Sequence, residues 1–248
     1  MERKYHILWH DTIDSTNSEA IRRLTEIDNM SVIAARCQTS GRGQRGNRWS
    51  SMPSENLTFS IVIRPGQDGI PKISARDQFR ISEITTIALT GYLKANGIEA
   101  RIKWPNDIYC GDRKICGILI EHSIRDGYVT SSVIGIGLNL NQTSFPPELP
   151  NPVSMKSLTG KSYSPGKELE RFMEYFSRLA CRADCPQLEE EYLQQMYRKD
   201  EKHMYTDIVG GTEFPGIIRG IAGDACLAME MPDGNIRKFA FKEIGYII

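Results

Sequence analysis

The chain has 248 residues, and its 31 Lys and Arg residues balance its 31 Asp and Glu residues, so the formal net charge is zero. A neutral chain does not favour a protein that binds nucleic acid or membranes through its overall charge. No 18-residue apolar run predicts a membrane-spanning helix, and no apolar segment of signal-peptide length stands near the first residue. The length predicts one large domain, or one domain with a small module.

Residue patterns predict helices and strands that do not follow the strict β-α-β order of a doubly wound sheet. The expected elements, in chain order, are a helix from Thr16, strands over Ser31–Arg36 and Leu57–Ile63, a helix over Ser74–Ala95, strands over Ala100–Trp104, Ile108–Cys110, Lys114–His122 and Tyr128–Leu140, and helices from Ser164 and over Gln187–Tyr197. Thr16 and Glu19 have the spacing of a capping box. We therefore predict an α+β domain over residues 1–200, with helices packed on a mixed, mostly antiparallel sheet.

The last part of the chain has a different residue pattern. Short β-like runs over Phe214–Arg219, Ala225–Met231 and Lys238–Phe241 are separated by turns that contain glycine. Short strands with turn signals every eight to ten residues are typical of a small barrel. We therefore predict a second, barrel-like domain over residues 205–248.

The cysteines and histidines give no metal signature. Six cysteines are scattered without a C-x-x-C pair, and Cys181 and Cys185 with four dispersed histidines match no zinc pattern. Scattered cysteines predict free thiols in a reducing compartment, so we expect a cytoplasmic protein. We expect no metal ion held by the protein itself.

The loop Ser40–Met52 (SGRGQRGNRWSSM) is the most informative segment. Three glycines alternate with Arg42, Arg45 and Arg48. Glycine allows close approach of the backbone to a ligand, and arginine presents a planar charged fork that suits carboxylates and phosphates. RG-rich stretches also occur in disordered RNA-binding tails, and a merely solvated basic loop is a further alternative. Because predicted strands flank the loop, we favour a clamp for an anionic ligand.

The second motif is the run Lys103-Trp104-Pro105-Asn106-Asp107, at the end of a predicted strand. Proline ends the strand and leaves Asn106 and Asp107 at its junction with a loop. Such a run is also common in plain turns. Lys114 follows seven residues after Asp107, so a hairpin through Gly111–Arg113 would bring them together. Lys114 could be a snorkelling surface residue, or could hold a carboxylate and a phosphate.

Two further motifs carry weaker signals. Gly135-Ile136-Gly137-Leu138-Asn139 contains a G-x-G, but no third glycine opens a helix, so a dinucleotide fingerprint is not supported. Glycines in a strand instead indicate close approach of another backbone or a flat ligand. The helix start at Asp14–Asn17 offers free N–H groups to a polar ligand. The sequence shows no nucleophile–base arrangement, which favours binding and charge stabilisation of an anion over covalent catalysis.

Together these four segments resemble the biotin protein ligases, enzymes that attach biotin to a lysine of biotin-dependent carboxylases. GRGQRGNRWSS, KWPNDIY, DRKICGILIE and GIGLNLN follow one another in a fixed order. The resemblance covers nearly the whole chain, and the C-terminal stretch resembles the SH3-like barrel of the family. It implies a short form without the N-terminal helix-turn-helix that some relatives carry, so neither a repressor role nor DNA binding is expected.

The resemblance implies a two-step reaction. The biotin carboxylate attacks the α-phosphate of ATP, whose Mg²⁺ arrives with the nucleotide, and gives biotinyl-5′-AMP and pyrophosphate. A lysine amine of the biotin carboxyl carrier protein or domain of acetyl-CoA carboxylase, or of a related carboxylase, then attacks the mixed anhydride, and AMP leaves. The acceptor is the implied protein partner, no membrane is implied, and the enzyme would be a monomer or a homodimer.

The resemblance also implies roles for individual residues. Residues implied to hold the ureido head of biotin are Ser15, Thr16, Asn17 and Gln38. Residues implied to close over biotin and its adenylate are Arg42, Gly43 and Gln44. Lys114 would contact the biotin carboxylate and the α-phosphate, and Gly117 would let the ligand lie against the sheet. Residues implied to bind ATP or the adenylate are Arg45, Trp49, Asn106 and Asn139. The implied catalytic set is Lys114, Arg42, Asp107 and Lys103, with Asp107 steering the incoming lysine or a metal-bound phosphate.

Gln44 is a departure, because some family members carry arginine there. If that position contacts the ligand through its backbone N–H, little is lost; if through the guanidinium, adenylate retention would be weaker. Two other functions remain open: a lipoate-protein ligase, which shares the fold and the adenylating chemistry, and a nucleic-acid-binding module that uses the Arg42–Arg48 loop. Zero net charge and a single interleaved aromatic, Trp49, weigh against the second.

Overall fold

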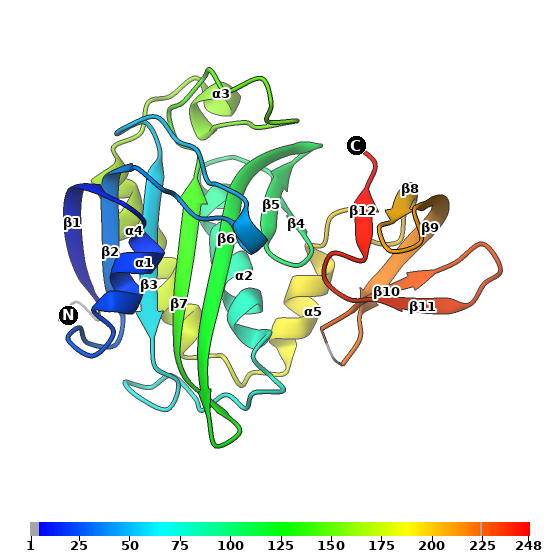
Figure 1. Cartoon of the computed structure of the whole chain (residues 1–248), viewed down its shortest axis with the longest axis horizontal. Helices are drawn as coiled ribbons and strands as arrows, with labels where there is room; N and C mark the ends of the chain where they lie inside the picture. Colours follow the sequence, from blue (N-terminus) through cyan, green and yellow to red (C-terminus); the bar gives the residue numbers. More distant parts are fainter. Residues whose placement is uncertain (1–4, 224) are drawn as a thin grey trace.

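The chain folds around a seven-stranded sheet, shown in the computed structural model of Figure 1. The structure describes residues 5–223 and 225–248, apart from the side chain of Arg45. The sheet order is β1-β2-β3-β7-β6-β5-β4. Its strands are β1 (His6–Ile13), β2 (Ser31–Gln38), β3 (Leu57–Ile63), β4 (Arg101–Lys103), β5 (Asp107–Cys110), β6 (Arg113–Arg125) and β7 (Tyr128–Leu138). β1 and β2 pair in parallel and the other neighbours pair antiparallel, which confirms the predicted fold class.

Helices cover both faces of this sheet. In Figure 1, α1 (Thr16–Arg22) lies in front of the strands, whereas α2 (Arg80–Ala95) and α4 (Pro165–Ala180) lie behind them. Successive side chains of a strand point to opposite faces. Ile61 and Ile63 of β3 therefore join the main core with α2 and α4, while Val62 joins the smaller cluster that contains Ala20 of α1. α5 (Gln187–Gln194) packs on α2.

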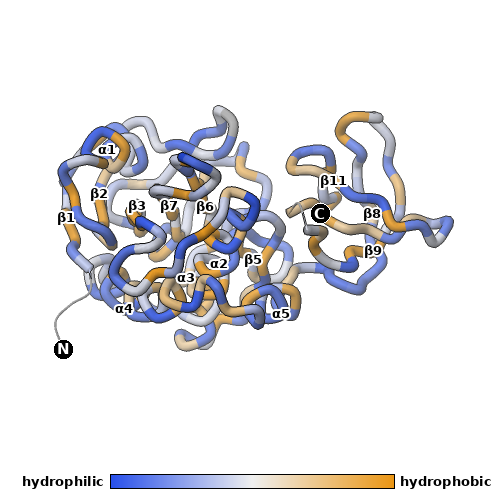
Figure 2. The backbone as a smooth tube through the Cα atoms, turned by 90° about the horizontal axis from the view of Figure 1, so that it is seen from below, coloured by the Kyte–Doolittle hydropathy of each residue, from blue (hydrophilic) through white to orange (hydrophobic). Residues whose placement is uncertain are grey.

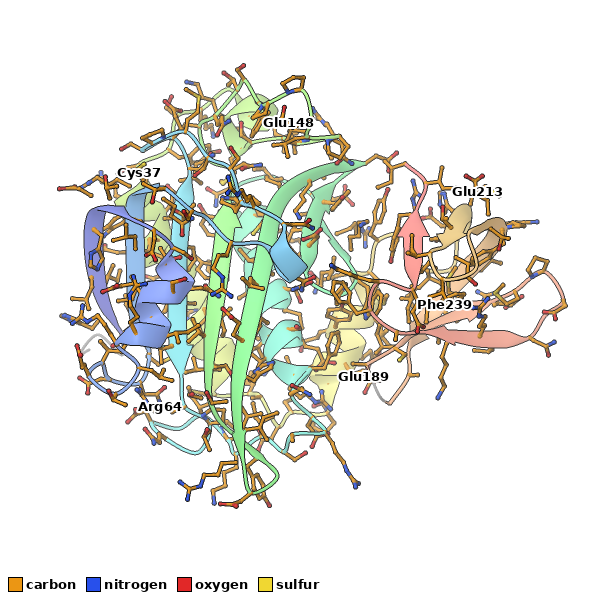
Figure 3. The ribbon with its side chains drawn as sticks, viewed as in Figure 1. Cys37, Arg64, Glu148, Glu189, Glu213 and Phe239 are labelled. Atoms are coloured by element: carbon orange, nitrogen blue, oxygen red, sulfur yellow. The ribbon has the colours of Figure 1, made fainter. Side chains whose placement is uncertain are left out.

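A second, smaller sheet follows in the chain. Its order is β11-β10-β9-β8-β12, with every pair antiparallel. The strands are β8 (Lys202–Asp207), β9 (Thr212–Ile221), β10 (Leu227–Glu230), β11 (Ile236–Phe239) and β12 (Ile244–Tyr246). Fully buried Phe239, labelled in Figure 3, belongs to its core. Figure 2 shows this C-terminal sheet as a lobe beside the larger sheet.

The predicted small β module is therefore confirmed as a second antiparallel sheet, whose described strands do not close into a complete barrel. β11 and β12 stand at the two ends of the strand order, and no hydrogen-bonded pair among the described strands joins them. The division of the chain into two domains near residue 200 stays a prediction.

Tertiary pairing moved two helix boundaries away from the sequence prediction. α2 begins at Arg80 rather than at Ser74. The N–H of Ala75 donates to Gly127, and that of Val129 donates to Ile73, so the end of the β6–β7 hairpin holds residues 73–75 in extended form. α5 ends at Gln194 rather than at Tyr197, because residues 195–197 hydrogen-bond to Ile102 of β4.

The sequence patterns do not predict β1, β8, β12 or the short helix α3 (Met155–Thr159). β12 has only three residues, too few for a periodic signal, and it forms by pairing with β8. None of the described helices is long and apolar enough to cross a membrane.

Candidate active site

A cavity of about 590 Å³ lies where the start of α1, the Ser40–Met52 loop, strands β5–β7 and the C-terminal sheet meet. In Figure 1 the loop, with its short 3-10 turn η1 (Gln44–Gly46), passes in front of β6. The loop is therefore one wall of the cavity.

The residues that received a site role from the sequence converge on this cavity, apart from Arg45, whose side chain lies outside the described part of the chain. They are Ser15, Thr16, Asn17, Gln38, Arg42, Gly43, Gln44, Trp49, Lys103, Asn106, Asp107, Lys114, Gly117 and Asn139. Their convergence is a structural finding, whereas their individual roles stay predictions.

The structure adds two segments that the sequence analysis did not place here. The first contributes Phe145, Leu149, Pro150, Asn151 and Pro152; the second contributes Phe241, Lys242, Ile244, Gly245 and Tyr246. In the structure the Lys114 N–H donates to the Asn151 carbonyl at 2.7 Å, and the Val153 N–H donates to the Lys114 carbonyl at 2.9 Å. The backbone of Lys114 is thus fixed on this side.

Lys114 and Asp107 form an ion pair at the cavity wall. The predicted turn joins β5 to β6, with Gly111 at a positive φ of 55°. This hairpin brings Lys114 Nζ to 2.7 Å from Asp107 Oδ1, as the sequence spacing predicts. The two side chains are 32% and 27% exposed, so solvent weakens the pair to about 1 kcal/mol or less. It therefore positions the two charges and adds little to stability.

The glycines of β7 are explained by close contacts within the protein. A Cβ added to Gly137 would overlap the Trp49 ring, and one added to Gly135 would overlap the Asn17 carboxamide. A Cβ at Gly117 would stand 3.1 Å from both Trp49 and Lys114. The Trp49 ring thus lies on the strands at the point where their side chains are missing, and its buried Nε1 has no hydrogen-bond partner among the described residues.

A polar network lies at the start of α1. The predicted capping box at Thr16 is wrong: Ser15 is the N-cap residue, and Gln38 Oε1 accepts from the Thr16 N–H at 2.8 Å and from its hydroxyl at 3.2 Å. Glu19, the other half of the predicted box, pairs with Arg22. The Gln38 Nε2 and Ser15 Oγ groups make no hydrogen bond to any described residue, so both remain available to a ligand.

The Asn17 carboxamide makes three hydrogen bonds to protein groups. Its Oδ1 accepts from the Ser60 hydroxyl at 2.6 Å, and its Nδ2 donates to the Leu119 carbonyl at 3.2 Å and to Glu121 Oε2 at 2.9 Å. Ser60 is fully buried on β3. Ser60 could not be identified from the sequence, because a serine in a strand has no motif of its own.

Glu121 is a second residue that the sequence analysis missed. Its carboxylate accepts hydrogen bonds from both terminal nitrogens of Arg42, at 2.8 and 3.1 Å, and from Asn17 Nδ2. Arg42 is the arginine that the loop motif assigns to an anionic ligand, and a paired carboxylate is itself such an anion. A ligand anion that binds Arg42 must therefore compete with Glu121 or share the guanidinium with it.

The side-chain amides of two predicted site residues also hydrogen-bond to protein groups. Asn106 Nδ2 donates to the Ile118 carbonyl at 2.6 Å, and Asn139 Nδ2 donates to the Val153 carbonyl at 3.0 Å. These bonds tie the turn after β4 and the end of β7 to neighbouring segments. Both residues shape the wall of the cavity, and their Oδ1 atoms remain as acceptors.

The cavity is strongly positive although the chain is neutral. Its described lining contains one carboxylate, Asp107, and five basic side chains, which are Arg42, Arg48, Lys103, Lys114 and Lys242. No cysteine or histidine stands among the described residues that line it. Nearby on β6, burial raises the pKa of the Cys116 thiol. The arrangement can bind and stabilise a polyanion, but it offers no thiolate or imidazole for covalent catalysis.

Residues 9–139 match the model of the Biotin/lipoate A/B protein ligase family. A biotin–[acetyl-CoA-carboxylase] ligase from Paracoccus denitrificans is 32% identical over 90% of this chain and 93% of its own length. The chain belongs to this ligase family. The bifunctional ligase/repressor BirA of Bacillus subtilis is 31% identical over 67% of the chain, which spans 49% of that relative. These matches confirm the predicted family and the predicted enzyme class of biotin ligases.

Solved structures agree on the fold. A biotin protein ligase from Aquifex aeolicus, in complex with biotin and ATP, superposes with a TM-score of 0.76 at 20% identity and covers 97% of each chain. A Helicobacter pylori biotin acetyl coenzyme A carboxylase synthetase with biotinylated ATP gives a TM-score of 0.59, also at 20% identity. The fold of the whole chain, C-terminal sheet included, is therefore that of the ligase family.

We expect Gly137→Ala to displace the Trp49 ring, because the new methyl group overlaps it. Overpacking of this kind costs about 1–3 kcal/mol, which urea unfolding will measure. Gly166→Ala on α4 is the matched control, since a Cβ there meets nothing within 4 Å. Equal stability of the two variants, with an unchanged Trp49 indole NMR signal, would contradict the packing described here.

We expect Glu121→Gln to loosen the loop by weakening its ion pair with Arg42. Amide hydrogen exchange across residues 40–52 should become faster in the variant without ligand, while the free energy of unfolding changes by about 1 kcal/mol or less. Glu99→Gln, which removes an exposed pair with Arg101, is the matched control. Unchanged exchange in Glu121→Gln would show that other contacts hold the loop.

Proposed function

We propose that this protein activates biotin as biotinyl-5′-AMP and transfers it to a lysine of a biotin carboxyl carrier protein or domain. The observation that carries the proposal is the Lys114–Asp107 pair beneath an arginine loop, in a cavity with five basic side chains, within a chain of the ligase family. Biotin brings one carboxylate and ATP a triphosphate, so the two substrates supply the negative charge that this cavity lacks.

Biotin fits with its ureido head toward α1 and its carboxylate toward Lys114. The unengaged Gln38 Nε2 and Ser15 Oγ are donors for the ureido oxygen, while Thr16 and Asn17 hold this corner together through Gln38 and Ser60. Gly117, which has no side chain, lets the Lys114 ammonium and the Trp49 ring lie close against the strand. Both Nδ2 hydrogens of Asn17 are used within the protein, so its direct contact with biotin would be through the second lone pair of Oδ1.

In the first step a biotin carboxylate oxygen attacks the α-phosphorus of ATP. A carbonyl–oxygen–phosphorus linkage forms, the bond to the β-phosphate oxygen breaks, and pyrophosphate leaves. Lys114 neutralises charge that develops on the α-phosphate, and Arg42 screens the repulsion between carboxylate and phosphate. Gly43 and Gln44 cover the junction from the loop, while Arg45, Trp49, Asn106 and Asn139 border the nucleotide.

In the second step the neutral amine of the acceptor lysine attacks the acyl carbon. A carbon–nitrogen bond forms, the bond to the phosphate oxygen breaks, and AMP leaves with the bonding electrons. Asp107 is the carboxylate in the described lining that can attract the incoming ammonium and take its proton. Its distance of 2.7 Å from Lys114 supports a role for both groups at the same reacting bond.

Magnesium fits as an ion carried by ATP. The described residues contain no cluster of three or more His, Cys, Asp or Glu side chains that could hold a metal. Mg²⁺ is usually bound through one or two carboxylates together with substrate phosphates and water. Asp107 supplies one such carboxylate, and the bound ion would neutralise part of the triphosphate charge.

The acceptor and the location are also part of the proposal. The Paracoccus relative is named for acetyl-CoA carboxylase, so a biotin carrier domain of such a carboxylase is the acceptor that we propose. A cytoplasmic location suits the buried thiols of Cys110 and Cys116, because a reducing compartment keeps thiols reduced.

The decisive test is ATP–pyrophosphate exchange by the purified protein. Exchange should require biotin and should not occur with lipoate in its place. Addition of a purified biotin carrier domain should then give a biotinylated lysine, detected by mass spectrometry. Exchange with lipoate alone, or none with either acid, would overturn the proposal.

We expect Lys114→Met to slow adenylate formation by about 10²–10³-fold, because it removes a cation that interacts most strongly with the transition state. The side chain keeps its length, so the fold should persist. Lys167→Met, at an exposed position on α4 outside the cavity lining, is the control and should keep the wild-type rate. Wild-type exchange by a folded Lys114→Met protein would remove Lys114 from the mechanism.

A further inference from the structure

Lys103 is held by aromatic rings from two different sheets. It ends β4 and lines the cavity. Its Nζ lies 5.1 Å from the ring centroid of Tyr109 on β5, and 4.4 Å from that of Tyr246 on β12 of the C-terminal sheet. Both distances are within the range of a cation–π interaction.

The two ring faces contact the Lys103 ammonium but accept no conventional hydrogen bond from it. Lys103 makes no ion pair within 4.0 Å and no hydrogen bond to any described residue, although an ammonium carries three donors. Three charges act on it from nearby: Asp107 raises its pKa, whereas Lys114 and Arg198 lower it. Burial is the largest cause, and it lowers the pKa of Lys103. A desolvated ammonium with unused donors is poised for an anion that enters the cavity.

Tyr246 is fixed in place by other tyrosines. Its ring stacks on Tyr197 with centroids 6.2 Å apart, and meets Tyr205 edge-on at 5.4 Å. Its buried hydroxyl has no hydrogen-bond partner among the described residues. An unpartnered buried hydroxyl is a cost to stability, so the contribution of Tyr246 to the site must come from its ring face.

We propose that Tyr246 is a positioning residue that holds Lys103 for the triphosphate of ATP, so that the C-terminal sheet completes the nucleotide end of the cavity. This inference rests on the proposed ligase function. A triphosphate is the ligand class that suits it, because Lys103 and Lys242 add two cations on the side of the cavity that faces the C-terminal sheet. The carboxylate of biotin is accounted for by Lys114 and Arg42.

The test compares Tyr246→Leu with Tyr246→Phe in biotin-dependent ATP–pyrophosphate exchange. Loss of the ring should raise the KM for ATP by about 3- to 30-fold, the range expected for a cation–π contact, and should leave the KM for biotin unchanged. Phenylalanine should restore the ATP KM. Tyr128→Leu, which removes the ring near Lys72 on the surface, is the matched control and should change neither constant.

A double-mutant cycle separates positioning from general damage to the fold. In a Lys103→Met background, Tyr246→Leu should cause no further rise in the ATP KM. Pentafluorophenylalanine at position 246 keeps the ring size and reverses the charge of the ring face, so it should act like leucine without disturbing packing. Additive effects, an equal rise in the biotin KM, or a wild-type ATP KM with the fluorinated ring would each overturn the proposal.

Failure of the ligase function can be told apart from failure of this inference. If the wild-type protein gave no biotin-dependent exchange, calorimetric binding of ATP would still compare Tyr246→Leu with wild type. Weaker ATP binding by the variant would support the positioning role without the ligase function. Equal ATP affinity would reject it whatever the reaction.

Discussion

The structure depends on the concentration of positive charge inside a neutral protein. Arg42, Arg48, Lys103, Lys114 and Lys242 border one cavity with a single carboxylate in its described lining, and like charges at such distances repel one another. The protein offsets this repulsion at three points: Asp107 pairs with Lys114, Glu121 pairs with Arg42, and two tyrosine rings cover Lys103. Each of these internal partners holds its cation at the wall of the cavity.

Strand geometry puts those charges in one place. The short β5–β6 hairpin folds Lys114 back onto Asp107, and the antiparallel pair β6–β7 sets Gly117 opposite Gly137. Missing side chains at these two positions let the Trp49 ring lie on the strands, so the arginine loop is anchored at one end over the cavity. The same sheet carries the Lys114–Asp107 pair and the contacts of the loop that forms one wall of the cavity.

Local patterns in the sequence were enough to predict the central strands, the β5–β6 hairpin and most of the cavity lining. The contact between Lys114 and Asp107 was predictable because a tight turn determines the register of the two strands that it joins. The ion pair between Glu121 and Arg42 could not be predicted from the sequence, since the two residues are 79 positions apart and belong to no common motif. It also missed Tyr246, because a three-residue strand has no period and takes its position from pairing with β8. The start of α2 was misplaced for the same reason: contacts with a distant hairpin outweighed local helix propensity.

The central claim is that the acyl–phosphate junction forms at Lys114, between the arginine loop and β6. A crystal structure of the protein with a non-hydrolysable analogue of biotinyl-5′-AMP tests this directly. We expect a phosphate oxygen within hydrogen-bond distance of Lys114 Nζ, about 2.7–3.2 Å, with the ureido oxygen near Gln38 and the adenosine toward Trp49. A ligand bound with its phosphate away from Lys114, or with its ureido head outside the corner at α1, would contradict the account.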